Sequence, residues 1–244
     1  MLEDSNRILE KIGPEDLVLD VGGWACPFNR ANWIIDSGPY ETRGFYASIG
    51  LPRSQGGDRE YFSRETWVSR DLCDREPWPF QDKQFDYSIC SHTLEDLRDP
   101  LYVCSELVRV SKAGYIEIPS RLWETCLGVE HPRIAGLSHH RWLIDRAGEH
   151  LQFTQKYHSI HSDFDLSFPV SYAQRLTLDD SIVRFHWKGG FTFAETTIHG
   201  SEGIRSFLSD FVAARNPSSR WRFWWRSGGN LIGRAAALLQ RAVK

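Results

Sequence analysis

Carboxylates and glycines follow the short apolar segments in the first third of the sequence. Asp20, Asp36 and Asp71 lie at or near the ends of three such segments, and Gly22-Gly23 closes the first one. Parallel strands of an open α/β sheet place their carboxyl ends along one edge, where ligands bind. A carboxylate after the second strand can accept both hydroxyls of a ribose, and glycine lets the backbone approach a ligand closely. The pattern therefore predicts a nucleoside site, with Asp71 placed to accept a hydrogen bond from an adenine amino group.

Five apolar segments are predicted to be the strands that position these residues. Each segment is short and is bounded by Gly, Pro or Asp. The segments cover residues 16–21, 33–36, 67–71, 85–90 and 114–119. Asp99-Pro100 predicts the start of a helix before the fifth strand, because proline suits the first helical position. Strands separated by helices or long connections indicate a mostly parallel α/β sheet with both faces covered.

The pattern changes after residue 120. Segments 142–144 and 151–153 are predicted to form an antiparallel pair, while residues 183–188 and 191–196 alternate around Gly189-Gly190 and predict a β-hairpin. Residues 203–214 are predicted to form a helix. We expect a ligand-binding core over residues 1–130, substrate-side loops and antiparallel strands that complete the same domain over residues 131–210, and a basic tail over residues 211–244.

The composition of the 244 residues is that of a globular protein. Ten Trp, fourteen Phe and eight Tyr carry too much apolar surface for a disordered chain. No apolar run is long enough to span a membrane, and the acidic segment Met1–Ser5 lacks the apolar stretch of a secretory signal. The five cysteines are scattered without a CxxC motif, which favours a reducing compartment and disfavours a structural zinc site. A cytoplasmic location is therefore expected.

The motifs, taken in order, resemble the class I S-adenosylmethionine-dependent methyltransferases, and the methyltransferase-11 type most closely. The resemblance covers roughly residues 17–119. It is carried by VLDVGG at residues 18–23, by Asp71-Leu72, by PFQDKQFDYSICSHTLED at residues 79–96 and by Asp99-Pro100. The segment that runs from PF through FD into SHTLE is the most specific part.

The resemblance implies a seven-strand, Rossmann-like sheet with helices on both faces that binds S-adenosyl-L-methionine. It implies that Gly22 and Gly23 pack under the amino-acid portion, that Asp36 holds the ribose, and that Asp71 with Leu72 contacts the adenine. Residues 90–92 would line the side where the methyl group is transferred. The complete set of expected cofactor-binding residues is Asp20, Gly22, Gly23, Asp36, Asp71, Leu72, Cys90 and Ser91.

Some positions depart from the family pattern. Trp24 and Cys26 stand where the family usually has glycine, so the indole must turn out of the pocket or fill part of it. Residues 27–31, PFNRA, resemble a branch with a shortened loop, and Asp96 replaces the usual His after Leu-Glu. An alternative function is therefore a catalytically degenerate fold that serves as a binding or scaffold protein. A nicotinamide dehydrogenase is disfavoured because the GxGxxG motif is missing.

Three histidines are the candidates for catalysis. Methyl transfer from a sulfonium is an in-line displacement that depends mainly on positioning, but a hydroxyl acceptor also needs a general base. His92 lies beside the expected methyl site, and His139 and His140 follow the fifth strand, where substrate loops are expected. The spacing of the histidines relative to Glu117 and Glu124 matches no standard ligand set, so no metal site is predicted.

Charge is distributed unevenly along the chain. Residues 211–244 carry six Arg, one Lys and no acidic residue, which leaves 22 basic and 32 acidic side chains in residues 1–210. Residues 220–226 interleave arginine with aromatic side chains, and residues 231–242 have the apolar periodicity of an amphipathic helix. A helix docked on the protein and contact with a membrane surface both remain open for residues 220–244, and nucleic-acid binding is less favoured.

The expected substrate is a small molecule or a glycan, such as a lipid-linked or cell-envelope precursor, methylated on oxygen or nitrogen. A membrane-facing tail would place the protein at the inner membrane surface. The sequence does not predict the oligomeric state.

Overall fold

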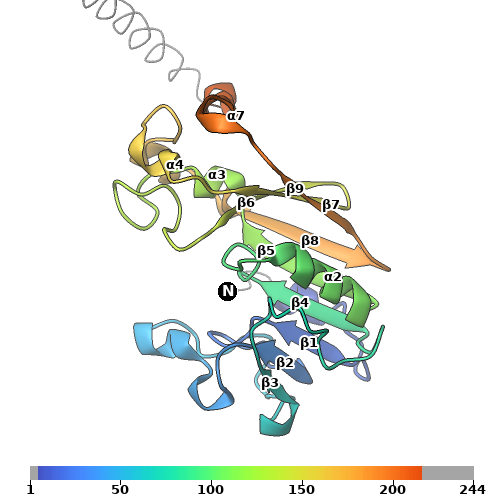
Figure 1. Ribbon diagram of the computed structural model, residues 1–244. Coiled ribbons are helices and arrows are strands. Elements are labelled where there is room, and N and C mark those ends of the chain that lie inside the picture. Colours follow the sequence, from blue (N-terminus) through green and yellow to red (C-terminus); the bar gives the residue numbers. More distant parts are fainter. Residues whose placement is uncertain (1–4, 216–244) are drawn as a thin grey trace, which may run out of the picture. The chain divides into compact units, whose positions relative to one another are not determined.

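The structure is a computed structural model that describes residues 5–215, apart from the side chain of Ser162 (Figure 1). The described chain divides into two compact units. The first unit contains residues 5–121, 139–156 and 177–197, and the second contains residues 122–138, 157–176 and 198–215. Residues 216–244, which carry most of the predicted basic tail, lie outside the described residues.

A six-stranded sheet forms the centre of the first unit. Its strand order is β3-β2-β1-β4-β5-β8. The strands are β1 (Val18–Val21), β2 (Trp33–Asp36), β3 (Trp67–Ser69), β4 (Tyr87–Ser91), β5 (Ala113–Pro119) and β8 (Ile182–Lys188). The first five are parallel, and β8 runs antiparallel to β5. All five predicted parallel strands are therefore confirmed, and the strand order reverses between β1 and β4, which is the usual ligand site of such sheets.

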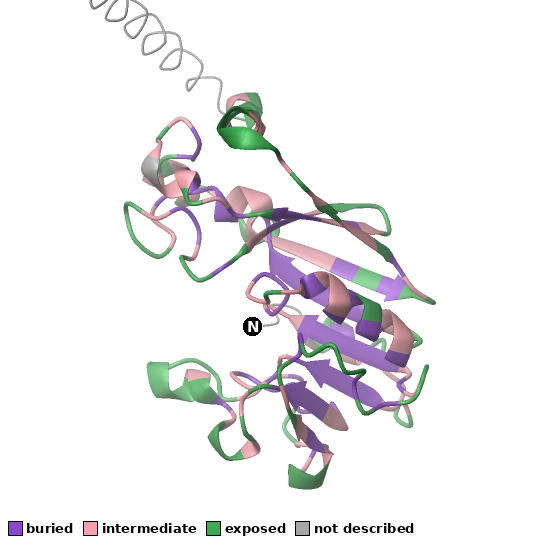
Figure 2. Ribbon diagram, viewed as in Figure 1, coloured by how far each residue is buried: buried purple, intermediate pink, exposed green. Residues whose placement is uncertain are grey.

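Both faces of this sheet are buried, which explains the continuous apolar runs in its strands (Figure 2). Leu19 and Val21 face a large apolar core together with the helix α2 (Pro100–Val110), whereas Val18 faces a smaller cluster together with Ile8. Helix α2 begins where it was predicted, because the Asp99 side chain caps it by accepting a hydrogen bond from the Tyr102 N–H at 3.1 Å.

A three-stranded sheet packs its apolar residues into the same large core. Its order is β6-β7-β9, with β6 (Trp142–Ala147), β7 (His150–Gln155) and β9 (Thr192–Thr196). The predicted antiparallel pair is confirmed by β6 and β7, in which Ile144 lies opposite Phe153. The predicted hairpin over residues 183–196 is wrong in its pairing, since β8 pairs with β5 and β9 pairs in parallel with β7.

Phe191 accounts for this separation of β8 from β9. The chain turns at Gly189-Gly190 as predicted, and both glycines have positive φ. Phe191 then turns inward and packs against Phe185 and Trp187, with ring centroids 5.3 Å apart in each pair. The apolar ring gains more from this burial than from the edge of a two-stranded ribbon, so β9 continues along β7.

The sheet also differs from expectation in the number of its strands and in the helices that accompany it. The described residues contribute six strands rather than seven to it, and α2 is the only helix longer than five residues that they contribute to the first unit. The connections before β2, β3 and β4 have no α-helix. They contain turns and the 3-10 helices η1 (Tyr40–Thr42), η2 (Phe45–Ile49) and η3 (Arg64–Thr66), and the other short helices of this unit are α1 (Ser5–Leu9) and α6 (Leu178–Ser181).

The second unit contains short helices and one longer one. They are α4 (Ser159–Ser162), α5 (Val170–Ala173) and α7 (Gly200–Arg215), while α3 (Arg121–Glu124) begins at the boundary between the units. Cys126, Phe168 and Val212 form its apolar core. The predicted helix over residues 203–214 is confirmed by α7. Among the described residues, no helix is long and apolar enough to cross a bilayer.

All five cysteines are buried, and none of them forms a disulfide.

Candidate functional site

The turn after β1 has no room for side chains. Gly22 has a φ of +80°, which favours glycine, and a Cβ added there would clash with Thr93. A Cβ added at Gly23 would clash with the carboxylate of Asp20. The Thr93 hydroxyl donates to the Ser91 carbonyl at 3.0 Å. The ends of β1 and β4 are therefore packed closely together at the point where the strand order reverses.

Asp20, in β1, contacts the turn that follows this strand. Its carboxylate is almost completely buried and accepts a hydrogen bond from the Phe28 N–H at 2.8 Å. Burial raises the pKa of Asp20 to about 7, although the Phe28 N–H acts in the opposite direction. Asp20 thus fixes the short connection that leads to β2, and its contacts are structural.

Asp36 ends β2 as predicted and holds the two neighbouring turns. It accepts hydrogen bonds from the N–H groups of Trp24 at 3.0 Å and Gly38 at 2.8 Å. Burial raises the pKa of Asp36, and these two N–H groups oppose that rise. Each carboxylate oxygen has two acceptor sites, so these bonds do not exhaust the capacity of Asp36 to bind a ribose hydroxyl.

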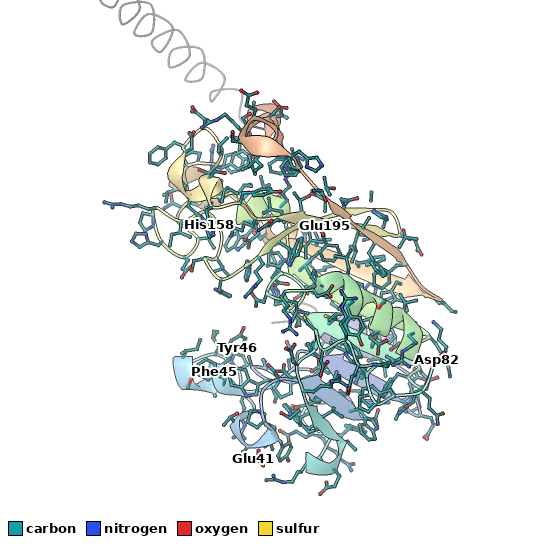
Figure 3. All side chains as sticks on the ribbon, in the orientation of Figure 1. Glu41, Phe45, Tyr46, Asp82, His158 and Glu195 are labelled. Carbon is teal, nitrogen blue, oxygen red and sulfur yellow. The ribbon has the colours of Figure 1, made fainter. Side chains whose placement is uncertain are left out.

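The Trp24 indole lies against the connection between β2 and β3. Its Nε1 donates to Thr42 Oγ1 at 2.9 Å, and its ring stacks on Phe45 with centroids 5.2 Å apart. Figure 3 labels Phe45 and Tyr46, which both belong to η2. The indole also covers Gly38 so closely that a Cβ at this glycine would clash with it. Trp24 therefore packs its indole on the segment that directly follows Asp36.

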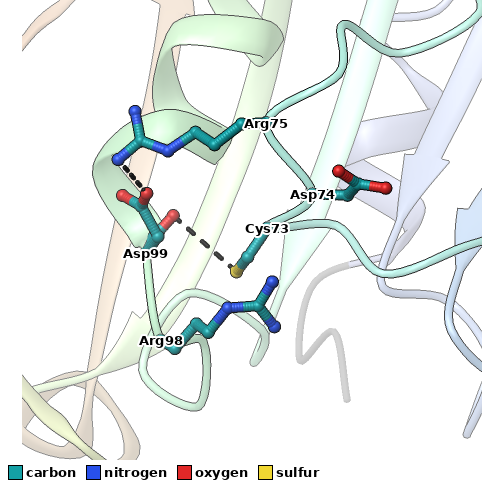
Figure 4. Close-up of a pocket in the computed structure, with 5 residues that line it drawn as sticks. All are labelled: Cys73, Asp74, Arg75, Arg98 and Asp99. Carbon is teal, nitrogen blue, oxygen red and sulfur yellow. Dashed lines mark hydrogen bonds and ion pairs between the residues drawn. The ribbon is translucent and has the colours of Figure 1, made fainter.

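Asp71 follows β3 and is half-exposed. It forms an ion pair with Arg98 and accepts from the Cys73 N–H at 2.9 Å, and the Arg98 guanidinium lowers the pKa of Asp71. Arg98 also lines an open hollow of about 630 Å³ (Figure 4). Arg75 and Asp99 form an ion pair at 2.5 Å on the rim of this hollow. The hollow thus lies next to the carboxylate that was predicted to contact an adenine.

Two of the predicted cofactor residues have their side chains in the core. Leu72 is 4% exposed and Cys90 is 1% exposed, and both pack in the large apolar core. Burial raises the pKa of the Cys90 thiol well above its ordinary value, so this thiol stays protonated. Only the main chain of these two residues can face a ligand at the sheet edge.

His92 lies between two buried carboxylates. Its Nε2 is 3.2 Å from Glu117 Oε1 and its Nδ1 is 3.4 Å from Glu95 Oε1. The backbone adopts a φ of 49° at His92, which is uncommon for a residue other than glycine. Burial alone would lower the pKa of His92, but the two carboxylates outweigh it and raise this pKa to about 9. His92 is therefore an imidazolium at neutral pH, which suits a hydrogen-bond donor and not a general base.

Glu117 is held in its charged form by its neighbours. Although burial opposes ionisation, hydrogen bonds from His92 and Tyr115 lower the pKa of Glu117. The Tyr115 hydroxyl donates to Glu117 Oε2 at 2.7 Å, and the Ser91 hydroxyl lies 3.4 Å from Oε1. The polar residues at the ends of β4 and β5 thus form one connected cluster.

Glu95 and Tyr46 were not predicted as site residues. Glu95 is 1% exposed, and its Oε2 has no hydrogen-bond partner among the described residues. Burial and the charges of Asp96, Cys26 and Glu95 raise the pKa of Tyr46, so these three side chains lie near the Tyr46 hydroxyl. Glu95 ends the motif SHTLE at residues 91–95, a signal that sequence reasoning could have used, whereas nothing in the sequence distinguishes Tyr46.

His139 and His140 lie beside the loop that follows β4. The Nε2 atoms of both rings are 3.8 Å from Asp96 Oδ1. The Arg141 N–H donates to the Glu95 carbonyl at 2.7 Å, which fixes the histidine pair next to this loop. The structure thus brings the three predicted histidines into one region, and it adds Asp96 as their acidic neighbour.

Solved structures similar to this chain include several methyltransferases. A candidate methyltransferase of Haloferax volcanii, in complex with the Trm112 methyltransferase activator, is 18% identical over 47% of this chain and 50% of that chain, with a TM-score of 0.33. A SAM-dependent methyltransferase of Aquifex aeolicus is 21% identical over 48% of this chain and 65% of that chain, with a TM-score of 0.30. A candidate methyltransferase of Bacillus halodurans is 16% identical over 76% of this chain and 95% of that chain, with a TM-score of 0.37.

The chain spans less than two thirds of the Haloferax and Aquifex chains. Among curated proteins, no significant match was found. The family model of methionine biosynthesis protein MetW matches residues 3–129, more than half of the 244 residues, and the chain belongs to this family.

Proposed function

We propose that this protein is an S-adenosylmethionine-dependent methyltransferase, nearest to the methyltransferase-11 type. The observation that carries the proposal is the anionic character of the edge where the strand order reverses. Asp36 ends β2 at this edge, and Glu95 and Glu117 lie on either side of the His92 imidazolium that follows β4. Such a site attracts a cation that bears a sulfonium and an ammonium group, and it repels the pyrophosphate of a dinucleotide.

The residues present fit this cofactor. An unpaired oxygen on a buried carboxylate costs about 1–3 kcal/mol, and a ligand ammonium or hydroxyl group would satisfy Glu95 Oε2. Asp36 retains acceptor capacity for a ribose hydroxyl. The Trp24 indole packs on Gly38, whose N–H donates to Asp36, so the indole lies close to this carboxylate.

S-adenosylmethionine, when bound, supplies a methyl group that is already activated for in-line displacement. The protein must then position the acceptor and exclude water, and positioning alone can be worth ~7–11 kcal/mol. Glu117 and Glu95 keep His92 charged and oriented, so that both N–H groups of the imidazolium face these carboxylates and the ring cannot take a proton at neutral pH. The Ser91 hydroxyl extends the same cluster toward the sheet edge.

The acceptor proposed is a small molecule or a glycan or cell-envelope precursor, methylated on oxygen or nitrogen. His139 and His140 support an acceptor side at the loop after β4, since the bond between Arg141 and Glu95 holds them there. The basic and aromatic composition of residues 220–244 supports a cytoplasmic protein that works at the inner membrane surface on such precursors.

Calorimetric titration of the full chain with S-adenosylmethionine and S-adenosylhomocysteine tests the proposal. We expect both to bind with a stoichiometry of one, and we expect Glu95→Gln to weaken binding by roughly 10- to 150-fold, since one charge-assisted hydrogen bond contributes roughly 1.5–3 kcal/mol. Glu10→Gln is the control. It changes an exposed carboxylate near the N-terminus, outside the proposed site, and should bind both ligands as the unchanged protein does.

Trp24→Ala adds a second arm to this experiment. If the indole must move to expose Asp36, its removal should tighten the binding of both ligands. Absence of binding by the unchanged protein and by Trp24→Ala at millimolar concentration would overturn the enzyme proposal and favour a scaffold function for this fold.

A further inference from the structure

Asp96, His139 and His140 bring three metal-ligating atoms close together. These atoms, one from each side chain, all lie within 4.8 Å of one another. The two Nε2 atoms are each 3.8 Å from Asp96 Oδ1, and the two imidazole rings have centroids 4.6 Å apart. Separations of 3.8 Å are too long for direct hydrogen bonds, which are usually 2.7–3.2 Å for N–H···O.

The two histidine–aspartate separations are instead close to those between ligands of one metal ion. Zinc binds histidine nitrogen and carboxylate oxygen at about 2.0–2.2 Å, so two ligands of a tetrahedral ion lie roughly 3.3–3.6 Å apart. The two histidine–aspartate distances need to shorten by only a few tenths of an ångström. Two imidazoles and one carboxylate are also a donor set that divalent transition metals prefer over Mg²⁺ or Ca²⁺.

The backbone around these residues is built to hold them together. The Arg141 N–H donates to the Glu95 carbonyl at 2.7 Å, and Trp142 Nε1 donates to the Leu97 carbonyl at 2.8 Å. These two hydrogen bonds join the residues directly after the histidine pair to the residues on both sides of Asp96. Trp142 is also the first residue of β6, so the histidine pair is anchored at the end of a paired strand.

The three side chains differ in exposure, so an ion could enter from solvent and retain one coordination position that no protein ligand fills. The His140 side chain is 4% exposed, while those of Asp96 and His139 are 41% and 60% exposed. His140 would therefore anchor the ion, and His139 could close on it from the solvent side. Three protein ligands leave at least one position for water or for an oxygen of another molecule, as in catalytic zinc sites.

We propose that Asp96, His139 and His140 form a binding site for one divalent transition-metal ion of the zinc type. The site stands next to the loop that contains His92 and Glu95. It does not depend on the proposed methyl transfer, because the ion can be measured without cofactor or acceptor.

The test uses the full chain, freed of metal with a chelator and then titrated with Zn²⁺ against a chromophoric competitor. Cobalt(II) is titrated in parallel, since its visible spectrum reports ligand number and geometry. We expect one tightly bound ion per chain and an increase in Tm on saturation with zinc. Asp96→Asn and His139→Ala should each weaken binding by more than the ~10–100-fold that loss of a mere supporting partner costs.

His199→Ala is the matched control, because this exposed histidine lies outside the cluster. His139 is itself exposed, so His139→Ala is expected to fold, and circular dichroism of each variant checks this. Zinc affinity that is equal in the unchanged protein, His139→Ala and Asp96→Asn would overturn the proposal. A cobalt(II) spectrum that is lost in His199→Ala as fully as in His139→Ala and Asp96→Asn would also overturn it.

Discussion

His92 connects the protonation state of the candidate site to the stability of the fold. Its ring lies between Glu117 and Glu95, which raise its pKa to about 9. An unfolded chain would have an imidazole pKa of about 6.5, so the folded state binds this proton more tightly. The resulting stabilisation is complete below about pH 6.5 and is lost as the pH rises through about 9.

Replacement of the ring should remove this dependence on pH. We expect His92→Gln to be less stable than the unchanged protein at pH 6, and we expect the difference to shrink by on the order of 1–3 kcal/mol at pH 9.5. Urea unfolding at these two pH values measures the free energies, and both values lie well above the range in which Glu117 becomes protonated. His199→Gln should show no such change, and a difference that is independent of pH would contradict the assignment.

At the scale of elements, α2 is tied to the connection that precedes β4. Glu106 is buried and accepts from the Trp78 N–H at 2.7 Å, and Arg109 donates to the same carboxylate at 2.7 Å and to the Phe80 carbonyl at 2.8 Å. The start of α2 could be predicted, because capping by Asp99 and a proline at the first position are local signals. The inward role of Glu106 could not, since an acid on a helix is ordinarily solvent-facing.

Loss of Glu106 should therefore release both α2 and the Trp78 segment. We expect Glu106→Ala to lower the free energy of unfolding by on the order of 3 kcal/mol, because the Trp78 N–H loses its acceptor and Arg109 loses its buried carboxylate partner. Asp82→Ala is the matched control, as Asp82 pairs with the same arginine but its side chain is 80% exposed. Equal losses in both variants, measured by denaturant unfolding, would show that the buried carboxylate has no special role.

Over the whole molecule, strand positions could be predicted from the sequence, but several partners could not. Apolar segments, either continuous or alternating with period two, identified β1 to β5 and also β6 to β9, because each pattern is local. The separation of β8 from β9 depends on Phe191 packing on Phe185, a contact that no local pattern reveals. The same limit applies to Asp96 and the histidine pair, which are far apart in sequence and meet only when β6 is placed beside the loop after β4.

Charge asymmetry leads to a prediction for the full chain. Residues 1–210 carry 32 acidic and 22 basic side chains, so an anionic surface should repel them, whereas residues 211–244 carry only basic charges. Any attraction to anionic lipid must then come from the tail. We expect the protein to sediment with vesicles that contain phosphatidylserine, to bind less as salt increases, and to bind much less to phosphatidylcholine alone.

Substitution of Arg220, Arg222 and Arg226 by Gln separates charge from apolar contact in this binding. Each arginine near an anionic surface contributes about 1 kcal/mol, so the triple variant should partition roughly 100-fold more weakly. Replacement of the same three residues by Lys retains the charge and should retain most of the binding. Vesicle binding that does not depend on these charges, or no binding by the unchanged chain, would remove the membrane surface from the proposed function while leaving the cofactor and metal predictions standing.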